Sequence, residues 1–326
     1  MTADESLTID GVSVPLSPLV LGTMTFGDTV DESTAHEVIE AALAAGITGI
    51  DTANGDAKSA TEGLISPLVK KHRDRIVLAT KAGMPHADAG DHSPLSAAGL
   101  RASVEGSLRR LDVESIDLFY LHQPDRAASL DETLGTIAQL HEEGKISALG
   151  ISNFAAWQAL DVIAAADAAG APRPVVAQNV YSVLARQIED EWLECGATHD
   201  IATMAYNPLA GGLLARRPST EGTPDRFTGS VLAQMYSQRY LSDSVLSAVE
   251  AFAAVADGAG IPQAELALRW VAGAQGIDSL LLGASRVSQH EANIAAVAKG
   301  PLPDDVLTAI DEATVSVRGS QPKYNR

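Results

Sequence analysis

The 326-residue sequence predicts a (β/α)8 barrel, in which eight parallel strands alternate with helices around a closed sheet. Short apolar segments alternate along the chain with amphipathic, alanine-rich segments, which is typical of a parallel sheet. A doubly wound open sheet has the same alternation. Polar residues at the ends of successive apolar segments favour the barrel, because a barrel gathers its strand ends at one mouth. We expect a single domain over residues 1–326, since α/β barrels often reach about 250 residues or more as one unit.

The strands can be assigned in order from the amino end. Residues 7–18 alternate apolar and polar side chains around Asp10-Gly11, a pair typical of a type I′ turn, so we expect an N-terminal β-hairpin before the barrel. Eight apolar segments then predict the barrel strands, at residues 19–23, 46–51, 75–81, 116–122, 146–152, 174–180, 201–207 and 279–285.

The segments between these strands predict helices and one lid. Residues 31–46 and 93–111 are amphipathic and carry an Asp or a Ser where an N-cap belongs. After the seventh strand, residues from 207 to about 240 form a long interruption rich in Gly, Pro, Ser and Arg. In a compact domain such a segment is more often functional than a linker, so we expect a long lid loop there.

Composition excludes several classes of partner. The formal net charge is −19 with a pI near 4.7, so no overall positive field attracts nucleic acid or an anionic membrane surface. The single cysteine, Cys195, excludes any multi-cysteine zinc or iron–sulfur site, and we expect no metal. No basic leader precedes an apolar core, and no apolar stretch approaches the roughly 20 residues of a membrane span. We therefore expect a cytoplasmic protein that acts on a small molecule.

The candidate chemistry lies at the ends of the predicted strands. The chain lacks a phosphate-binding P-loop, a nucleophile elbow, an H-E-x-x-H motif and an early G-x-G-x-x-G, which disfavours the commonest nucleotide hydrolases, esterases, zinc proteases and Rossmann dehydrogenases. A lone polar residue at a strand end is usually solvated or structural, but several in register indicate one polar pocket. These residues are Asp51, Lys81, His122, Ser152, Asn153, Gln178, Tyr206, Asn207, Ser285 and Arg286.

Over nearly its whole length the sequence resembles the aldo-keto reductases. The resemblance rests on the segments LGTMTFG, GITGIDTA, LATKAG, DLFYLHQPD, GKISALGISNF, AQNVYS, AYNPLAGGLL and LLGASRVSQHEAN. It is strongest toward the aflatoxin-aldehyde and succinic-semialdehyde reductase branch, through YNPLAGGLL, DRF, MYSQRYL and the terminal PKYNR. The resemblance implies a barrel that binds a nicotinamide coenzyme and delivers hydride to a carbonyl carbon.

The resemblance also assigns coenzyme contacts along the chain. Ser152, Asn153 and Gln178 would hold the carboxamide, and Tyr206 would stack on the ring. Two cations, Arg217 and Arg286, favour NADP(H) because they can meet a 2′-phosphate. The loop from Asn207 to Arg217 would cover the pyrophosphate, and the remaining contacts would come from Gly22, Thr23, Leu209, Gly211, Arg226, Gly283, Ser285, Gln289 and Asn293.

The family's catalytic tetrad is Asp, Tyr, Lys and His, in which Lys and Asp lower the phenol pKa so that Tyr can protonate the developing alkoxide. Asp51, Lys81 and His122 match three of these residues. The Tyr normally lies five residues after the Asp, and here that position is Asp56. Glu62 matches the family's next glutamate, so the alignment has no gap.

Asp56 changes the chemistry that the resemblance implies. No tyrosine precedes Tyr120, so a shifted alignment cannot restore the phenol. The shorter side chain leaves space for water or a larger substrate. We expect nearby Lys81 to lower the pKa of the Asp56 carboxyl and keep it ionised, which makes it a poor proton donor. Loss of a general acid typically costs about 10² to 10⁴ in rate.

Three hypotheses follow for the reaction. The first is a reductase that takes its proton from His122, Lys81 or water, or that reduces an activated iminium or enone. The second is an NADP-binding protein that acts as a sensor or assembly partner. The third is a coenzyme-binding enzyme of elimination or epimerisation, with Asp56 as a base.

The predicted lid also suggests what the substrate carries. In the branch that the sequence resembles, the substrate contacts would be Tyr236, Arg239 and Arg326. Two arginines over the mouth favour an anionic substrate, whereas an ion pair between Arg239 and an acid of the lid would remove that argument. The same branch implies a homodimer.

Overall fold

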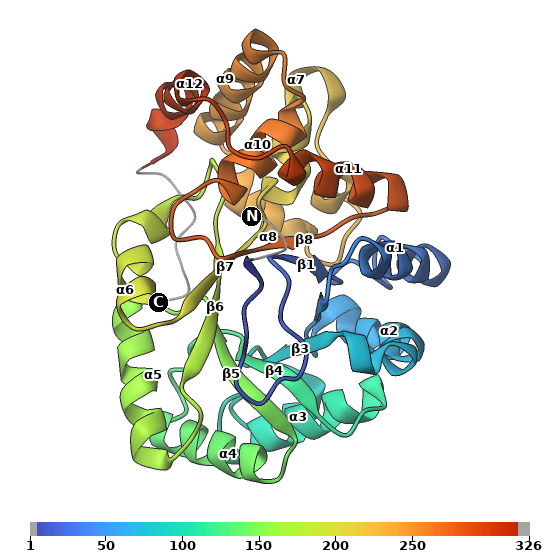
Figure 1. Ribbon diagram of the computed structural model, residues 1–326, viewed down its shortest axis with the longest axis vertical. Coiled ribbons are helices and arrows are strands. Elements are labelled where there is room, and N and C mark those ends of the chain that lie inside the picture. Colours follow the sequence, from blue (N-terminus) through green and yellow to red (C-terminus); the bar gives the residue numbers. More distant parts are fainter. Residues whose placement is uncertain (1–4, 319–326) are drawn as a thin grey trace.

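The structure, a computed structural model, describes residues 5–318 as a closed barrel with strand order β1 to β8 (Figure 1). Every strand pairs in parallel with its neighbours, and β1 closes the barrel against β8. The barrel prediction is therefore confirmed, and each strand overlaps its predicted segment. The strands are β1 (Leu19–Gly22), β2 (Gly49–Asp51), β3 (Val77–Ala82), β4 (Ile116–Leu121), β5 (Ile146–Ser152), β6 (Pro174–Val180), β7 (Ala202–Tyr206) and β8 (Ser279–Leu282).

Helices surround this sheet, as Figure 1 shows. The side chains of Asp31 and Ser96 accept hydrogen bonds from the first turns of α1 and α3, as their sequence positions predict. The α-helices are α1 (Glu32–Ala44), α2 (Ala60–Lys71), α3 (Ala97–Leu111), α4 (Leu130–Glu142), α5 (Ala156–Ala169), α6 (Trp192–Thr198), α7 (Pro218–Glu221), α8 (Ala233–Tyr240), α9 (Asp243–Ala259), α10 (Gln263–Ala272), α11 (Val287–Ala298) and α12 (Asp304–Thr314). Shorter 3₁₀ segments are η2 (Asp56–Ser59), η3 (Arg73–Arg75), η4 (Ala87–Ala89), η5 (Gln187–Glu189), η6 (Ala210–Ala215), η7 (Asp225–Phe227) and η8 (Val315–Val317).

The N-terminal hairpin is present but smaller than predicted. Leu7 and Leu16 form one antiparallel bridge, with backbone hydrogen bonds of 2.8 and 2.9 Å. Of the two turn residues, only Gly11 has a positive φ, of +80°, so the turn is not of type I′, which needs a positive φ at Asp10 as well. The type I′ prediction was wrong because the Asp-Gly pair also suits turns with one left-handed residue.

The hairpin covers the amino end of the barrel. Ile9 joins Leu16 in one buried cluster with inward-facing strand residues such as Val77, Leu118 and Val176. Side chains alternate across each strand, so this cluster fills the barrel and the opposite faces pack against the helices. Because apolar side chains fill the amino end of the barrel, we expect a polar site at its carboxyl end.

The segment after β7 is more ordered than the predicted lid loop. Residues 207–240, where the lid loop is predicted, contain the short helical elements η6, α7, η7 and α8. Three aromatic rings hold the segment together, with centroids 5.6 to 6.4 Å apart: Phe227, Tyr236 and Tyr240. A Cβ at Gly211 would lie 2.7 Å from the Tyr236 ring, so this close approach requires glycine.

Among residues 5–318, no single helix is long and apolar enough to cross a membrane. In the described part of the chain, one pair of helices, α9 and α10, reaches that length and composition when taken together, and the pair is bent by 96° at its junction.

Candidate active site

A buried ion pair joins the carboxyl ends of β2 and β3. Asp51 pairs in register with Ala79, and Lys81 follows two residues later on the same face of β3. The Lys81 ammonium contacts Asp51 Oδ1 and donates to the backbone carbonyl of Thr52 at 2.9 Å. Both side chains are almost fully buried, at 5% and 3% exposure. The barrel register therefore fixes one positive and one negative group at the mouth.

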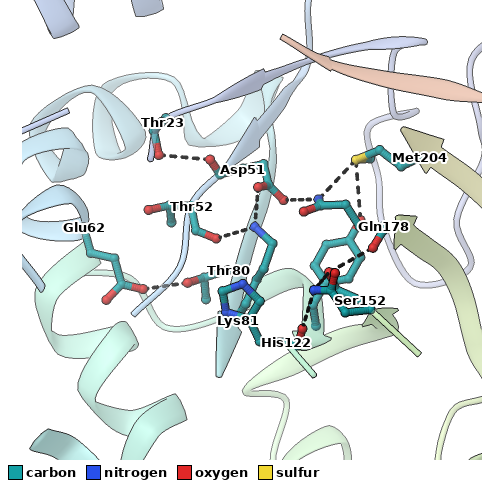
Figure 2. A network of polar contacts seen from close by, with 12 residues as sticks. Thr23, Asp51, Thr52, Glu62, Thr80, Lys81, His122, Ser152, Gln178 and Met204 are labelled. Atoms are coloured by element: carbon teal, nitrogen blue, oxygen red, sulfur yellow. Dashed lines mark hydrogen bonds and ion pairs between the residues drawn. The ribbon is translucent and has the colours of Figure 1, made fainter. Parts of the chain in front are cut away.

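Further polar residues extend this pair across the barrel (Figure 2). Gln178 on β6 donates from Nε2 to Asp51 Oδ2 at 2.9 Å and lies between Asp51 and Met204. Ser152 on β5 donates from Oγ to the Gln178 carbonyl at 2.9 Å, and Thr23 donates from Oγ1 to the Asp51 carbonyl at 2.9 Å. Both Asp51 carboxylate oxygens thus have donors.

Tyr120 on β4 lies in the barrel interior beneath this pair. Its ring centroid is 5.6 Å from Lys81 Nζ, and its hydroxyl is 3.9 Å from Met204 Sδ. Burial, together with the negative charge of Asp51, raises the pKa of the Tyr120 phenol well above its usual value. The phenol therefore stays neutral. Sequence reasoning had not assigned Tyr120 to the site, although the alternation of β4 points it inward.

A second buried carboxylate, that of Glu62, bonds to β3 from the helix side of the strand. Glu62 on α2 is fully buried and accepts from Thr80 Oγ1 at 2.6 Å (Figure 2) and from Arg110 Nε at 2.8 Å. Arg110 also pairs with Asp88 in the loop after β3. This chain of charges ties α2 and α3 to the strand that carries Lys81.

His122 follows β4 and is neutral at physiological pH. Burial and the nearby positive charge of Lys81 lower the pKa of its imidazole to about 3. Its buried Nδ1 has no hydrogen-bond partner within residues 5–318. A neutral imidazole can donate a hydrogen bond to a carbonyl oxygen, but it is a weak source of protons.

Asp56, in place of the tyrosine that the resemblance implies, holds its proton more strongly than the sequence suggested. Burial raises the pKa of its carboxyl to about 7. Lys81 opposes this increase, and the charges of Asp51 and Glu62 add to it. The expectation that Lys81 keeps Asp56 ionised was wrong, because desolvation and two like charges outweigh one cation already paired with Asp51.

The carboxyl ends of β5 and β7 present an amide and a phenol to the same mouth. Tyr206 donates from its hydroxyl to Asn153 Oδ1 at 2.7 Å, and Asn153 Nδ2 donates to the His122 carbonyl at 3.0 Å. Asn207 accepts from the Gly211 N–H at 2.7 Å. Both asparagines have a φ of +61°, a conformation that asparagine tolerates better than most residues.

Arg239 on α8 is surrounded by phenols. Its guanidinium interacts with Tyr206, Tyr236 and Tyr240. Among the side chains that the structure describes, no salt bridge reaches Arg239, so the ion pair with a lid acid does not form with any of them. Arg326, the other predicted substrate contact, lies outside the described residues.

The predicted adenosine end lies at the start of α11. Ser285 donates from its backbone N–H and from its hydroxyl to Gln289 Oε1, each at 3.0 Å. Arg286 is exposed at the N-terminus of the helix. Asn293 Nδ2 is buried and has no partner within the described residues. By contrast, Arg217 is bound to Asp257 and donates to the Ala253 carbonyl at 3.1 Å, so it is not a free cation.

A model of the aldo/keto reductase family matches residues 18–315. The chain belongs to the aldo/keto reductase family. Human aldo-keto reductase family 7 member A3 is 35% identical over 325 residues, which cover 94% of this chain and 96% of the relative. Human aflatoxin B1 aldehyde reductase member 2 is 34% identical over 325 residues, with 94% and 89% covered. Human aflatoxin B1 aldehyde reductase member 4 is 35% identical over 323 residues, with 94% and 96% covered. The resemblance seen in the sequence is confirmed, and the protein is an oxidoreductase by family.

Aldo/keto reductases generally use nicotinamide coenzymes, and the chemistry of this chain fits such a group. Asn293 offers a buried amide donor without a partner, and Arg286 offers a cation at a helix N-terminus, a position that favours phosphate. Four other predicted contacts lie at the ends of β1 and β8 and in the segment after β7. Gly22 packs against Leu281, Gly283 is exposed beside the Gly22 carbonyl, Leu209 precedes η6, and Arg226 donates to the Tyr236 hydroxyl at 3.3 Å.

Proposed function

We propose that this aldo/keto reductase uses NADP(H) to reduce an aldehyde or ketone and that Asp56 supplies the proton. The pKa of about 7 at Asp56 carries the proposal. An acid with a pKa near the working pH combines a substantial protonated fraction with a useful tendency to give the proton away. The neutral carboxylic acid can therefore replace the phenol that the family places there.

The neighbouring groups take other roles in this proposal. Lys81 is bonded to Asp51 and to the Thr52 carbonyl, so it acts through its charge on the developing alkoxide and on Asp56. His122 is neutral and would donate a hydrogen bond to the carbonyl oxygen. When bound, the reduced coenzyme supplies a hydride.

Arg286 supports the preference for the 2′-phosphorylated coenzyme. It is exposed and has no ion pair within residues 5–318, whereas Arg217 is engaged by Asp257. A charge-assisted hydrogen bond is worth about 1.5–3 kcal/mol, or about 10- to 100-fold in affinity. Arg286→Ala should weaken NADPH binding by that factor and leave NADH binding unchanged, with Arg217→Ala as the matched control. Equal effects on both coenzymes would oppose the assignment.

We also propose that the substrate is an aldehyde with an anionic group. The names of two of the relatives identify them as reductases of an aldehyde. Arg239 lies among three tyrosines, without a bound acid among the described side chains. Arg239→Met should raise KM for succinic semialdehyde about 10- to 100-fold and leave 4-nitrobenzaldehyde unaffected. A similar loss for both aldehydes would assign Arg239 to packing of the lid.

The role of Asp56 is tested by the pH dependence of kcat/KM for NADPH oxidation with 4-nitrobenzaldehyde. Because the acid form is required, activity should fall as the pH rises above about 7. Asp56→Asn should lose about 10² to 10⁴ in rate, and Asp56→Tyr should restore activity with the alkaline limit moved upward. Full activity of Asp56→Asn would exclude Asp56 as the donor.

The same pKa also favours a second candidate, a non-redox elimination or epimerisation in which Asp56 is the base. That reaction needs the carboxylate, so its rate would rise through pH 7 where the reductase rate falls. The direction of the pH profile therefore separates the two functions.

A further inference from the structure

A second cluster of reactive side chains lies at the carboxyl end of the barrel, apart from the residues assigned to reduction. Ser59 ends η2 after β2, and His86 and Asp88 lie in the loop after β3. Ser59 Oγ is 2.6 Å from His86 Nε2, and His86 Nδ1 is 3.1 Å from Asp88 Oδ2. Hydroxyl, imidazole and carboxylate in this order are the arrangement that activates a serine nucleophile.

The contacts of His86 Nδ1 indicate which of the two ring nitrogens carries the hydrogen. With hydrogen on Nδ1, that N–H lies beside the Asp88 carboxylate, and Nε2 is free to accept from Ser59. With hydrogen on Nε2, Nδ1 instead accepts from the Asp88 backbone N–H at 3.2 Å. The negative charge of the Asp88 carboxylate beside Nδ1 favours hydrogen on that nitrogen, which is the tautomer that activates Ser59.

The rest of the fold holds Asp88 in position. Arg110 donates to Asp88 Oδ1 at 3.0 Å and to Oδ2 at 2.8 Å. A Cβ at Gly106 on α3 would lie 2.3 Å from Asp88 Oδ2, so the carboxylate requires glycine there. Arg110 also pairs with Glu62, so two carboxylates share one cation.

The backbone at Ser59 is strained in a way that suits a nucleophile. Ala57, Lys58 and Ser59 have φ values of +44°, +56° and +77°, a conformation unfavourable for residues with a side chain. Strain of this kind clusters at functional sites, and nucleophilic serines of many hydrolases lie in a strained turn just before a helix. Ser59 directly precedes α2 and is half-buried, so its hydroxyl is not sealed in the core.

We propose that Ser59 is the nucleophile of an acyl-transfer site that takes carboxylic esters, with His86 as general base and Asp88 as the group that orients it. Ser59 Oγ bonds to the ester carbonyl carbon while its proton passes to His86 Nε2. The ester C–O bond then breaks, and the alcohol leaves with that proton. Water releases the carboxylic acid by the same route, so the reaction needs no coenzyme. It is independent of the proposed reduction.

The test uses the full-length protein without coenzyme, 4-nitrophenyl acetate as ester, and a fluorophosphonate probe with mapping of the labelled peptide. We expect labelling at Ser59 that is lost in Ser59→Ala and slowed at least about 10²-fold in His86→Gln. Ser93→Ala is the matched control, because Ser93 Oγ donates to the Asp125 carboxylate at 2.5 Å. In Ser93→Ala, labelling and hydrolysis should equal those of the native protein.

Two readouts separate chemistry from folding. The labelling rate of the native protein should rise with pH through one ionisation that His86→Gln removes, whereas a structural role for His86 would lower Tm and keep the pH dependence. The proposal is overturned by labelling elsewhere, by native rates in Ser59→Ala, or by a folded protein that reacts no faster than its heat-unfolded form.

Discussion

The strand ends and the loop after β2 supply neighbouring parts of one site but are built differently. Asp51 and Lys81 lie on adjacent strands, almost fully buried, and bonded to each other. Asp56 is the first residue of η2, and the other three residues of η2 lie in the left-handed region. Strand register thus fixes the charge pair rigidly, while the loop places a carboxyl where its surroundings raise its pKa to about 7. The barrel fixes the charge pair, and in the proposed reduction the loop determines which group transfers the proton.

The largest expected change in stability comes from the charge pair on β2 and β3. Lys81→Met leaves the Asp51 carboxylate buried without its cation, which should lower the free energy of unfolding by about 3–5 kcal/mol in urea denaturation. The double variant with Asp51→Asn should recover much of this loss because no buried charge remains. A loss below about 1 kcal/mol in the single variant would mean that water reaches the pair.

A smaller loss of stability is expected where a glycine in a packed strand, rather than in an open loop, is replaced by alanine. A Cβ at Gly150 on β5 would lie 2.5 Å from the Tyr120 ring, so Gly150→Ala should cost about 1–3 kcal/mol of unfolding free energy. Gly55, just before η2, has a φ of −87° and nothing within 4 Å of its Cβ position. Gly55→Ala is the matched control and should change stability by less than about 0.5 kcal/mol. Equal losses of unfolding free energy in the two variants would show that the strand is packed no more tightly than the loop.

The smallest effect tests the strain itself. Lys58 is exposed with a φ of +56°, so Lys58→Gly should relieve about 1–2 kcal/mol of left-handed strain, partly offset by the entropy of glycine. We expect a net gain of roughly 0.5 kcal/mol in chemical denaturation. Ala60→Gly, at a φ of −76°, should instead cost about 1 kcal/mol. A loss in both variants would show that the loop carries no strain.

The sequence predicts the residues at the strand ends better than the properties of the loop after β2. Strand periodicity places Asp51, Lys81 and Gln178 at one mouth, and the family resemblance assigns them roles before any coordinates are known. The pKa of Asp56 could not be predicted, because it depends on how burial and three neighbouring charges combine in space.

Other contacts between loops could not be predicted for the same reason. Arg217 pairs with Asp257, whereas Arg239 has no acidic partner among the described side chains. Residue type alone does not distinguish these two arginines. Ser59 and His86 are 27 residues apart in the chain, and no known spacing motif links them. Contacts between loops require the three-dimensional structure, whereas positions on strands follow from a period of two.

The most direct measurement is the ionisation of the Asp56 carboxyl itself, followed by ¹³C NMR of aspartate side chains with Asp56→Asn to identify its signal. The account predicts a midpoint near pH 7, because burial and the charges of Asp51 and Glu62 outweigh Lys81. The protonated form would then be available for transfer at neutral pH. A midpoint near or below the ordinary aspartate value of about 4 would contradict it, because Asp56 would then be a carboxylate throughout the working range.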